Sequence, residues 1–267
     1  MRCKKIFRIC AAFIKTKEIT MTDIKTYENE RQKSIDSLML EWKNSFSEKS
    51  RELFVSDGFY PYYFTQKTKI LFMGKESLEM AGGNYIDELS ECYAKSKKVG
   101  DIPLNSYAFH RRILYLAYGI LNKKSSLEDF NAMPTADKIG DGFATENGIS
   151  FAFMNISKVS NESTIYADME IIKKRAEDNK KFIRREIDIL EPDIIISGNI
   201  GHILAPMFDN FEVVERLGED VCVHKVKLNG REILYLDCWH FSNFTKADFA
   251  NFYSPVCSAV KKYFKNS

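Results

Sequence analysis

The chain has 267 residues, of which 45% are hydrophobic and 28% are charged. This composition is typical of a globular protein, and it excludes a disordered, collagenous or disulfide-scaffold chain. The formal charge is only +2, so any face that binds nucleic acid must be local. The length predicts one domain over residues 23–267, preceded by an N-terminal appendage over residues 1–22 that is a candidate for disorder.

The cysteine pattern and the hydropathy limit the cofactor and the compartment. The six cysteines include no C-x-x-C pair and no companion histidine at metal-ligand spacing, so we expect no zinc, iron–sulfur or other cofactor. Scattered thiols are typical of a reducing compartment, so we expect a cytoplasmic protein. We also expect a monomer. No apolar run reaches the roughly 20 residues that span a bilayer, so we expect no membrane partner. Residues 2–14 superficially resemble a signal peptide, but Arg8 interrupts their apolar patch and no small-residue cleavage site follows.

The pattern along the first two thirds of the chain alternates between helix and strand. Apolar residues at three- and four-residue intervals predict a helix between residues 23 and 50. Residues 57–64 are aromatic and contain Gly and Pro, so we expect a loop that packs against the core or lines a cleft. The remaining periodic segments predict buried strands at 69–73, 151–155 and 193–197, and helices at 106–121 and 167–190.

The last third of the chain predicts a hairpin and a closing helix. An Asn-Gly pair separates residues 221–228 from residues 231–236, and this pair favours a two-residue hairpin turn. A helix is predicted over residues 255–264, with Ser254 as its N-cap. Alternating strands and helices predict an α/β fold, namely a three-layer α/β/α sandwich with a central, mostly parallel sheet.

The residues that follow each predicted core strand are unusually polar. Ligands of open α/β sheets bind outside the carboxyl ends of the strands, so we expect these residues to surround one cleft. They form four segments along the chain: Gly74-Lys75-Glu76-Ser77, Asn155 with Ser157-Lys158, Gly198-Asn199, and residues 237–244.

These four segments, in this order, resemble those of the uracil-DNA glycosylase superfamily. Its members carry a glycine-led catalytic loop after the first core strand, an Asn-bearing second strand and a His-x-Ser loop after the last strand. The resemblance covers residues 69–264, although the first loop often reads Gly-Gln-Asp-Pro-Tyr in the family and only Gly74 is identical. It implies a uracil-DNA glycosylase-like fold and a DNA glycosylase, which flips a base out of DNA, hydrolyses its N-glycosidic bond and leaves an abasic site.

The resemblance assigns a role to three polar residues. Glu76 falls where the family's carboxylate activates water and stabilises positive charge on the sugar, and His240 falls where a histidine donates to the pyrimidine O2. Both act where charge develops in an oxocarbenium-like transition state. Asn155 matches the asparagine that reads the base edge, and one amide both donates and accepts, as this readout requires.

The remaining site predictions surround these three residues. Phe244 falls where the family inserts a leucine into the duplex, and a phenylalanine wedge would act by stacking. Tyr107 or Phe109 would stack on the extruded base. The other predicted contacts to the substrate and its phosphates are Gly74, Lys75, Ser77, Lys158 and Ser242.

The departures from the family pattern bear on the substrate. Leu78 stands where uracil-specific members place a tyrosine that blocks the 5-methyl group of thymine. Without that tyrosine the pocket admits a larger base. The expected substrate is therefore uracil or a 5-substituted cytosine or uracil in DNA. The expected role is base-excision repair, or defence against phage with modified DNA.

Simpler interpretations stay open for each residue. A glutamate after a buried strand is often a solvated charge at a helix start, a lone histidine or asparagine there is commonly structural, and Tyr107 and Phe109 fit ordinary helix surface that faces a core.

Two other functions also stay open. One is a non-catalytic DNA-binding protein of the same fold, with Glu76 in an ion pair with Lys75, and the other is a hydrolase or transferase of free nucleosides. A nucleoside enzyme has no use for a wedge, so an exposed Phe244 favours action on DNA.

Overall fold

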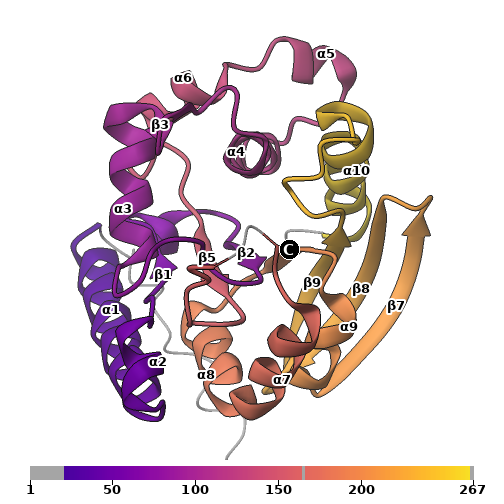
Figure 1. Ribbon diagram of the computed structural model, residues 1–267. Coiled ribbons are helices and arrows are strands. Elements are labelled where there is room, and N and C mark those ends of the chain that lie inside the picture. The colour runs from indigo at the N-terminus through magenta and orange to yellow at the C-terminus, as the bar shows by residue number, and fades with distance from the viewer. Residues whose placement is uncertain (1–20, 164–165, 265–267) are drawn as a thin grey trace, which may run out of the picture.

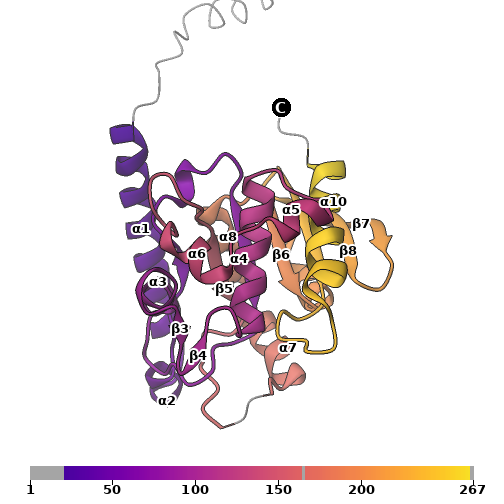
Figure 2. The ribbon, with the colours of Figure 1, turned by 90° about the horizontal axis from the view of Figure 1, so that it is seen from above.

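The computed structural model describes residues 21–163 and 166–264. Its strands are β1 (Gly58–Phe59), β2 (Ile70–Gly74), β3 (Lys98–Val99), β4 (Ile102–Pro103), β5 (Ala152–Asn155), β6 (Ile194–Gly198), β7 (Asn210–Leu217), β8 (Val221–Leu228) and β9 (Arg231–Cys238). Seven of them form one sheet in the order β1-β5-β2-β6-β9-β8-β7, and β3 and β4 form a separate ribbon (Figure 1 and Figure 2). The four central strands, β5, β2, β6 and β9, are parallel, whereas β1, β8 and β7 join antiparallel.

Helices cover both faces of this sheet (Figure 1). One layer contains α1 (Met21–Asn44), α2 (Glu48–Glu52), α7 (Met169–Asp178), α8 (Lys180–Leu190) and α9 (Gly201–Leu204). The other layer contains α3 (Tyr85–Glu91), α4 (Ala108–Leu121), α5 (Leu127–Asn131), α6 (Ala136–Asp141) and α10 (Ser254–Tyr263).

Each central strand is buried on both faces, which explains its continuous apolar sequence. In β2, Ile70 and Phe72 belong to the hydrophobic core on the α4 and α10 side, whereas Leu71 and Met73 belong to the core on the α1 and α8 side. Successive strand residues point to opposite faces, so one run of apolar residues serves both layers. The mixed α/β class with helices on both faces is confirmed.

Two predicted helices are each interrupted. The helix predicted over residues 167–190 is α7 and α8, with Asn179 between them. The side chain of Asn179 accepts a hydrogen bond from Nε1 of Trp42 (2.8 Å) and donates one to the carbonyl of Arg175 (2.8 Å). Both halves keep their apolar faces on the same core, so the apolar periodicity does not reveal the break. Similarly, the helix predicted over residues 23–50 is α1 and α2.

The predicted hairpin is confirmed, with Asn229 and Gly230 at φ 50° and 80° in its turn. Its second strand, β9, continues to Cys238 because it pairs with β6 as well as β8. The edge strand β7 was not predicted. The predicted N-cap at Ser254 is wrong, because α10 continues directly from a π-helical turn (Asp248–Tyr253).

The aromatic segment at residues 57–64 packs against the core, as expected. Tyr60 and Tyr63 are fully buried, and residues 58–59 additionally form the unpredicted strand β1. Residues 1–20, most of the predicted appendage, lie outside the described residues, and α1 begins at Met21. Across the described ranges, no helix combines the length and the apolar character needed to cross a membrane.

Candidate active site

The predicted site residues gather at the carboxyl edge of the parallel strands. The chain leaves β2 toward β5 and leaves β6 toward β9, so β2 and β6 flank the point where the strand order reverses. Open α/β sheets bind ligands at this point. Gly74 at the end of β2 lies opposite Asn155 at the end of β5, and Gly198 at the end of β6 lies opposite Cys238. The loops after these strands therefore begin side by side.

Gly74 and Asn155 fit together closely. A Cβ atom at position 74 would overlap Oδ1 of Asn155, so only glycine leaves room for this amide against β2. Asn155 is 3% exposed, and its backbone N–H donates to Oδ2 of Asp57 (2.7 Å). Its Nδ2 group is buried and has no hydrogen-bond partner among the described residues. Leaving such a donor unpaired costs about 1–3 kcal/mol. A ligand that offers a hydrogen-bond acceptor to this amide would therefore bind favourably.

The loop that carries Glu76 is fixed by backbone hydrogen bonds to the chain after β5. Ser157 donates to the carbonyl of Lys75 (2.8 Å), and Asn161 donates to the carbonyl of Ser77 (2.9 Å). These bonds extend the pairing of β2 with β5 beyond both strands. The position of Glu76 therefore follows from the sheet itself.

Two side chains hold the Glu76 carboxylate. Nδ2 of Asn161 donates to Oε1 (3.0 Å), and Nη1 of Arg175 lies 3.4 Å from Oε2. Burial nevertheless raises the pKa of Glu76, and it outweighs the lowering by Asn161 and Arg175. The non-catalytic alternative predicted an ion pair with Lys75, but the ion pair found in the described part of the chain is with Arg175.

His240 is neutral at neutral pH. Burial, and secondly the charge of Lys75, lower its pKa to about 4. Its Nδ1 accepts a hydrogen bond from the backbone N–H of Ser242 (3.3 Å), so the proton of the neutral ring resides on Nε2. Lys75, whose own pKa is lowered by burial, interacts electrostatically with both His240 and Glu76. The structure thus brings Glu76, Lys75 and His240 together.

Of the two predicted stacking residues, Phe109 lies beside the site. Its ring centroid is 5.8 Å from that of His240 and 6.2 Å from that of Phe153, two residues before Asn155. Tyr107 is the N-cap residue of α4, and its ring centroid lies 4.7 Å from that of His110. Phe109 is therefore the better placed of the two for contact with a bound ring.

The remaining predicted contacts differ in accessibility. Ser77 is buried and its Oγ has no hydrogen-bond partner among the described residues, whereas Ser242 is exposed and contacts His240 through its backbone. Phe244 is 92% exposed, which agrees with the exposure expected of a wedge.

Lys158 requires a correction. Its side chain is fully buried, with the ammonium paired to Asp57 and lying 2.8 Å from Oε2 of Glu186 and 4.9 Å from the centre of the Trp42 ring. An ammonium enclosed in this way does not reach a phosphate. Lys158 instead holds Asp57, whose other oxygen accepts the N–H of Asn155.

The sequence interpretation missed three residues that organise the site. They are Asp57, Asn161 and Arg175, which hold Asn155 or Glu76 from other segments of the chain. Arg175 is 99 residues from Glu76, and no local motif marks it. A lone acid in the aromatic segment is the one signal that marks Asp57.

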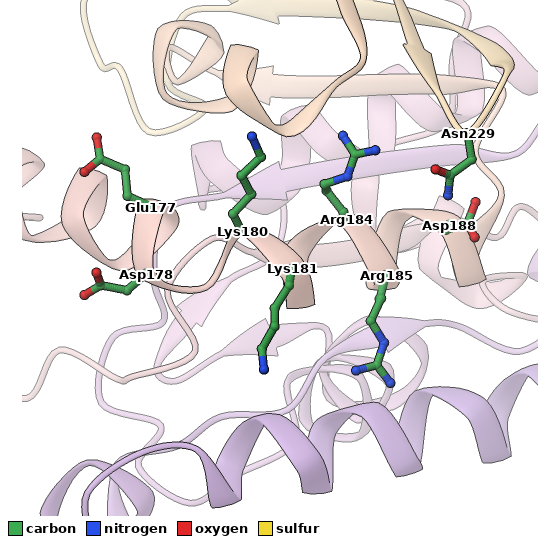
Figure 3. Close-up of a pocket in the computed structure, with 8 residues that line it drawn as sticks. All are labelled: Glu177, Asp178, Lys180, Lys181, Arg184, Arg185, Asp188 and Asn229. Carbon is green, nitrogen blue, oxygen red and sulfur yellow. The ribbon is translucent and has the colours of Figure 1, made fainter.

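A separate pocket of about 600 Å³ lies along α8 (Figure 3). It contains none of the predicted site residues. Its two arginines already pair with acids, Arg184 with Asp209 (2.6 Å) and Arg185 with Glu41 (2.7 Å), and we assign no anion site there. The lining residues are Glu177, Asp178, Lys180, Lys181, Arg184, Arg185, Asp188 and Asn229.

No protein-family model matches this sequence, and no curated protein matches it significantly. Within residues 21–163 and 166–264, no cluster of three or more His, Cys, Asp or Glu side chains is placed to hold a metal ion. The geometry of the carboxyl edge is therefore the basis for a functional proposal.

Proposed function

We propose that the protein is a monofunctional DNA glycosylase with a uracil-DNA glycosylase-like fold. The observation that carries this proposal is the buried Nδ2 of Asn155, which has no hydrogen-bond partner in residues 21–163 and 166–264. It lies at the same sheet edge as the Glu76 carboxylate and the neutral His240. An amide, a carboxylate and a neutral N–H donor are the groups that recognise a base, stabilise a cationic sugar and stabilise a departing base.

The proposed reaction breaks the bond between C1′ and the base nitrogen. The base reaches this edge of the sheet after extrusion from the DNA, and the Asn155 amide binds the edge of the base. Nε2–H of His240 donates to the O2 atom as negative charge develops on the departing base. Glu76 stabilises the cationic sugar and accepts a proton from water, whose oxygen bonds to C1′. The products are the free base and an abasic site.

The substrate class follows from the residue after Ser77. Leu78 takes the place of the family's blocking tyrosine, and it is 41% exposed at a bridge with Asn161. An aliphatic side chain there supports a range that includes 5-substituted pyrimidines. We propose a cytoplasmic monomer that acts on DNA in repair or in defence against phage with modified DNA.

The test of this proposal is excision from defined DNA. Purified protein is incubated with single-stranded and duplex oligonucleotides that carry uracil, 5-hydroxymethylcytosine or glucosylated 5-hydroxymethylcytosine, followed by alkali cleavage. We expect strand breaks at the modified position of at least one substrate. Unmodified DNA is the control. Binding without breaks on any substrate would support the non-catalytic alternative instead.

Truncation of the wedge should affect duplex DNA selectively. In Phe244→Ala we expect excision from duplex to fall about tenfold or more while excision from single strands changes little, because only the duplex must replace a stacked base. The measurement is the ratio of duplex to single-strand rates for one modified base. Leu40→Ala, another exposed apolar side chain, is the matched control. Equal losses on both substrates would contradict a wedge role.

A further inference from the structure

Contacts of the Phe244 side chain cannot be what fixes its position. That side chain is 92% exposed, so few contacts constrain it. Its direction must be set by the backbone of residues 240–248, which we term the wedge loop. The same loop begins with His240, two residues after the end of β9.

One buried arginine of α4 holds the backbone on both sides of Phe244. Nη1 of Arg112 donates to the carbonyls of Phe241 (2.6 Å) and Asn243 (2.9 Å), and Nη2 donates to the carbonyl of Lys246 (2.6 Å). These carbonyls bracket the tip of the loop. A guanidinium carries five N–H donors in a rigid plane, which lets a single side chain fix several acceptors at once.

Arg112 is itself held firmly. It is 4% exposed, and its Nε donates to Oδ1 of Asp248 (2.7 Å) at the end of the wedge loop. Its guanidinium lies 4.2 Å from the centre of the Phe252 ring, and Arg111 binds the other oxygen of Asp248 (2.7 Å). Ion pairs at this depth are strong only when every partner is in place.

Helix α4 also reaches the base-binding side of the site. Phe109 lies three residues before Arg112, and its ring centroid is 5.8 Å from that of His240. In Figure 2 the chain before α10 runs beside the N-terminal end of α4. The first turns of α4 therefore contact the start of the wedge loop through Phe109 and its tip through Arg112.

We propose that Arg112 is a positioning residue that fixes the wedge loop in the geometry needed to enter a duplex. This role rests on the proposed glycosylase function. It requires no contact between Arg112 and DNA. Displacement of a functional group by about 1 Å can lower a rate about 100-fold. Loss of the hydrogen bonds from Arg112 to the wedge loop, which we term the clamp, should therefore lower duplex excision without any change in Glu76 or Asn155.

The kinetic test uses Arg112→Met and Arg112→Lys with Arg184→Met as matched control. Arg184 also binds a backbone carbonyl and a carboxylate, but it lies on α8. We expect Arg112→Met to lower duplex excision about 10- to 100-fold and single-strand excision much less. Lysine has three donors on one atom, so Arg112→Lys should recover only part of the loss. Equal losses on duplex and single strands would overturn the proposal.

A second measurement is independent of catalysis. Trypsin cleaves after Lys246, whose carbonyl Arg112 holds, so we expect cleavage of the 246–247 bond to accelerate about tenfold or more in Arg112→Met. Urea denaturation of each variant separates this local effect from global destabilisation. An unchanged cleavage rate in a folded variant would overturn the clamp. If the wild-type protein excises no base, the proposed function fails, and faster cleavage would then support the clamp alone.

Discussion

Replacement of Glu76 by glutamine is expected to lower the rate of base excision by about two to four orders of magnitude. Glutamine keeps the size of the side chain and can still accept the hydrogen bond from Asn161, but it removes the negative charge that stabilises the sugar and the base that activates water. The measurement is single-turnover excision on the best substrate, so that product release does not enter.

The matched control is Glu79→Gln. Glu79 lies in the same loop and is exposed, so its replacement should leave the rate within about twofold of wild type if only the partly buried carboxylate of Glu76 acts. A wild-type rate in Glu76→Gln would remove Glu76 from the mechanism and would favour a non-catalytic protein.

The same carboxylate sets the expected pH dependence. Catalysis needs Glu76 ionised and His240 neutral. Burial raises the pKa of Glu76 above its ordinary 4.5, whereas burial lowers that of His240 to about 4. The rate should therefore rise with pH as Glu76 loses its proton, with a midpoint above 4.5, and show no step near 6.5. A step near 6.5 that disappears in His240→Gln would show that His240 titrates as a solvated histidine instead.

Replacement of Lys158 by methionine is expected to destabilise the fold by about 3–5 kcal/mol. Methionine fills a similar volume, but it leaves the carboxyl groups of Asp57 and Glu186 buried, at 1% and 0% exposure, without the ammonium that lies against both. The measurement is the free energy of unfolding from urea denaturation at pH 7. Asp57 also holds the N–H of Asn155, so excision should fall as well.

Lys174→Met is the control for this prediction. Lys174 is 76% exposed and pairs with Asp178 at 3.1 Å, so its loss should change stability by less than about 1 kcal/mol. A similarly small change in Lys158→Met would contradict the structural role assigned to the buried ammonium.

The loss of folding stability in Lys158→Met should also depend on pH. Burial, and then the charge of Asp57, raise the pKa of Glu186 well above its ordinary value. A carboxyl group with a raised pKa in the folded state stabilises the fold at low pH, and this contribution is lost as the pH rises. The Lys158 ammonium lowers this pKa, so its loss should raise the pKa of Glu186 further, and the variant should take up a proton at a higher pH than the wild type. The stability deficit of Lys158→Met should therefore shrink as the pH falls from 7 toward 5.

Local sequence determined the framework of this protein. The strands β2, β5 and β6 were predictable because burial on both faces demands an unbroken apolar run. The hairpin was predictable because Asn-Gly satisfies the positive φ angles of its turn. The placement of Glu76, Asn155 and His240 at one edge followed from their positions just after strands of a parallel sheet.

Only the tertiary structure decided how each polar side chain is used. The segment Asn155 to Lys158 illustrates this. The amide of Asn155 keeps a donor that pairs with no other described residue, while Lys158, three residues later, is enclosed between Asp57 and Glu186. No local sequence pattern indicated the roles of Arg112 and Arg175 either. The physical reason is that backbone preference and apolar periodicity depend on neighbours in sequence, whereas the burial and partners of a charged side chain depend on segments brought together from far along the chain.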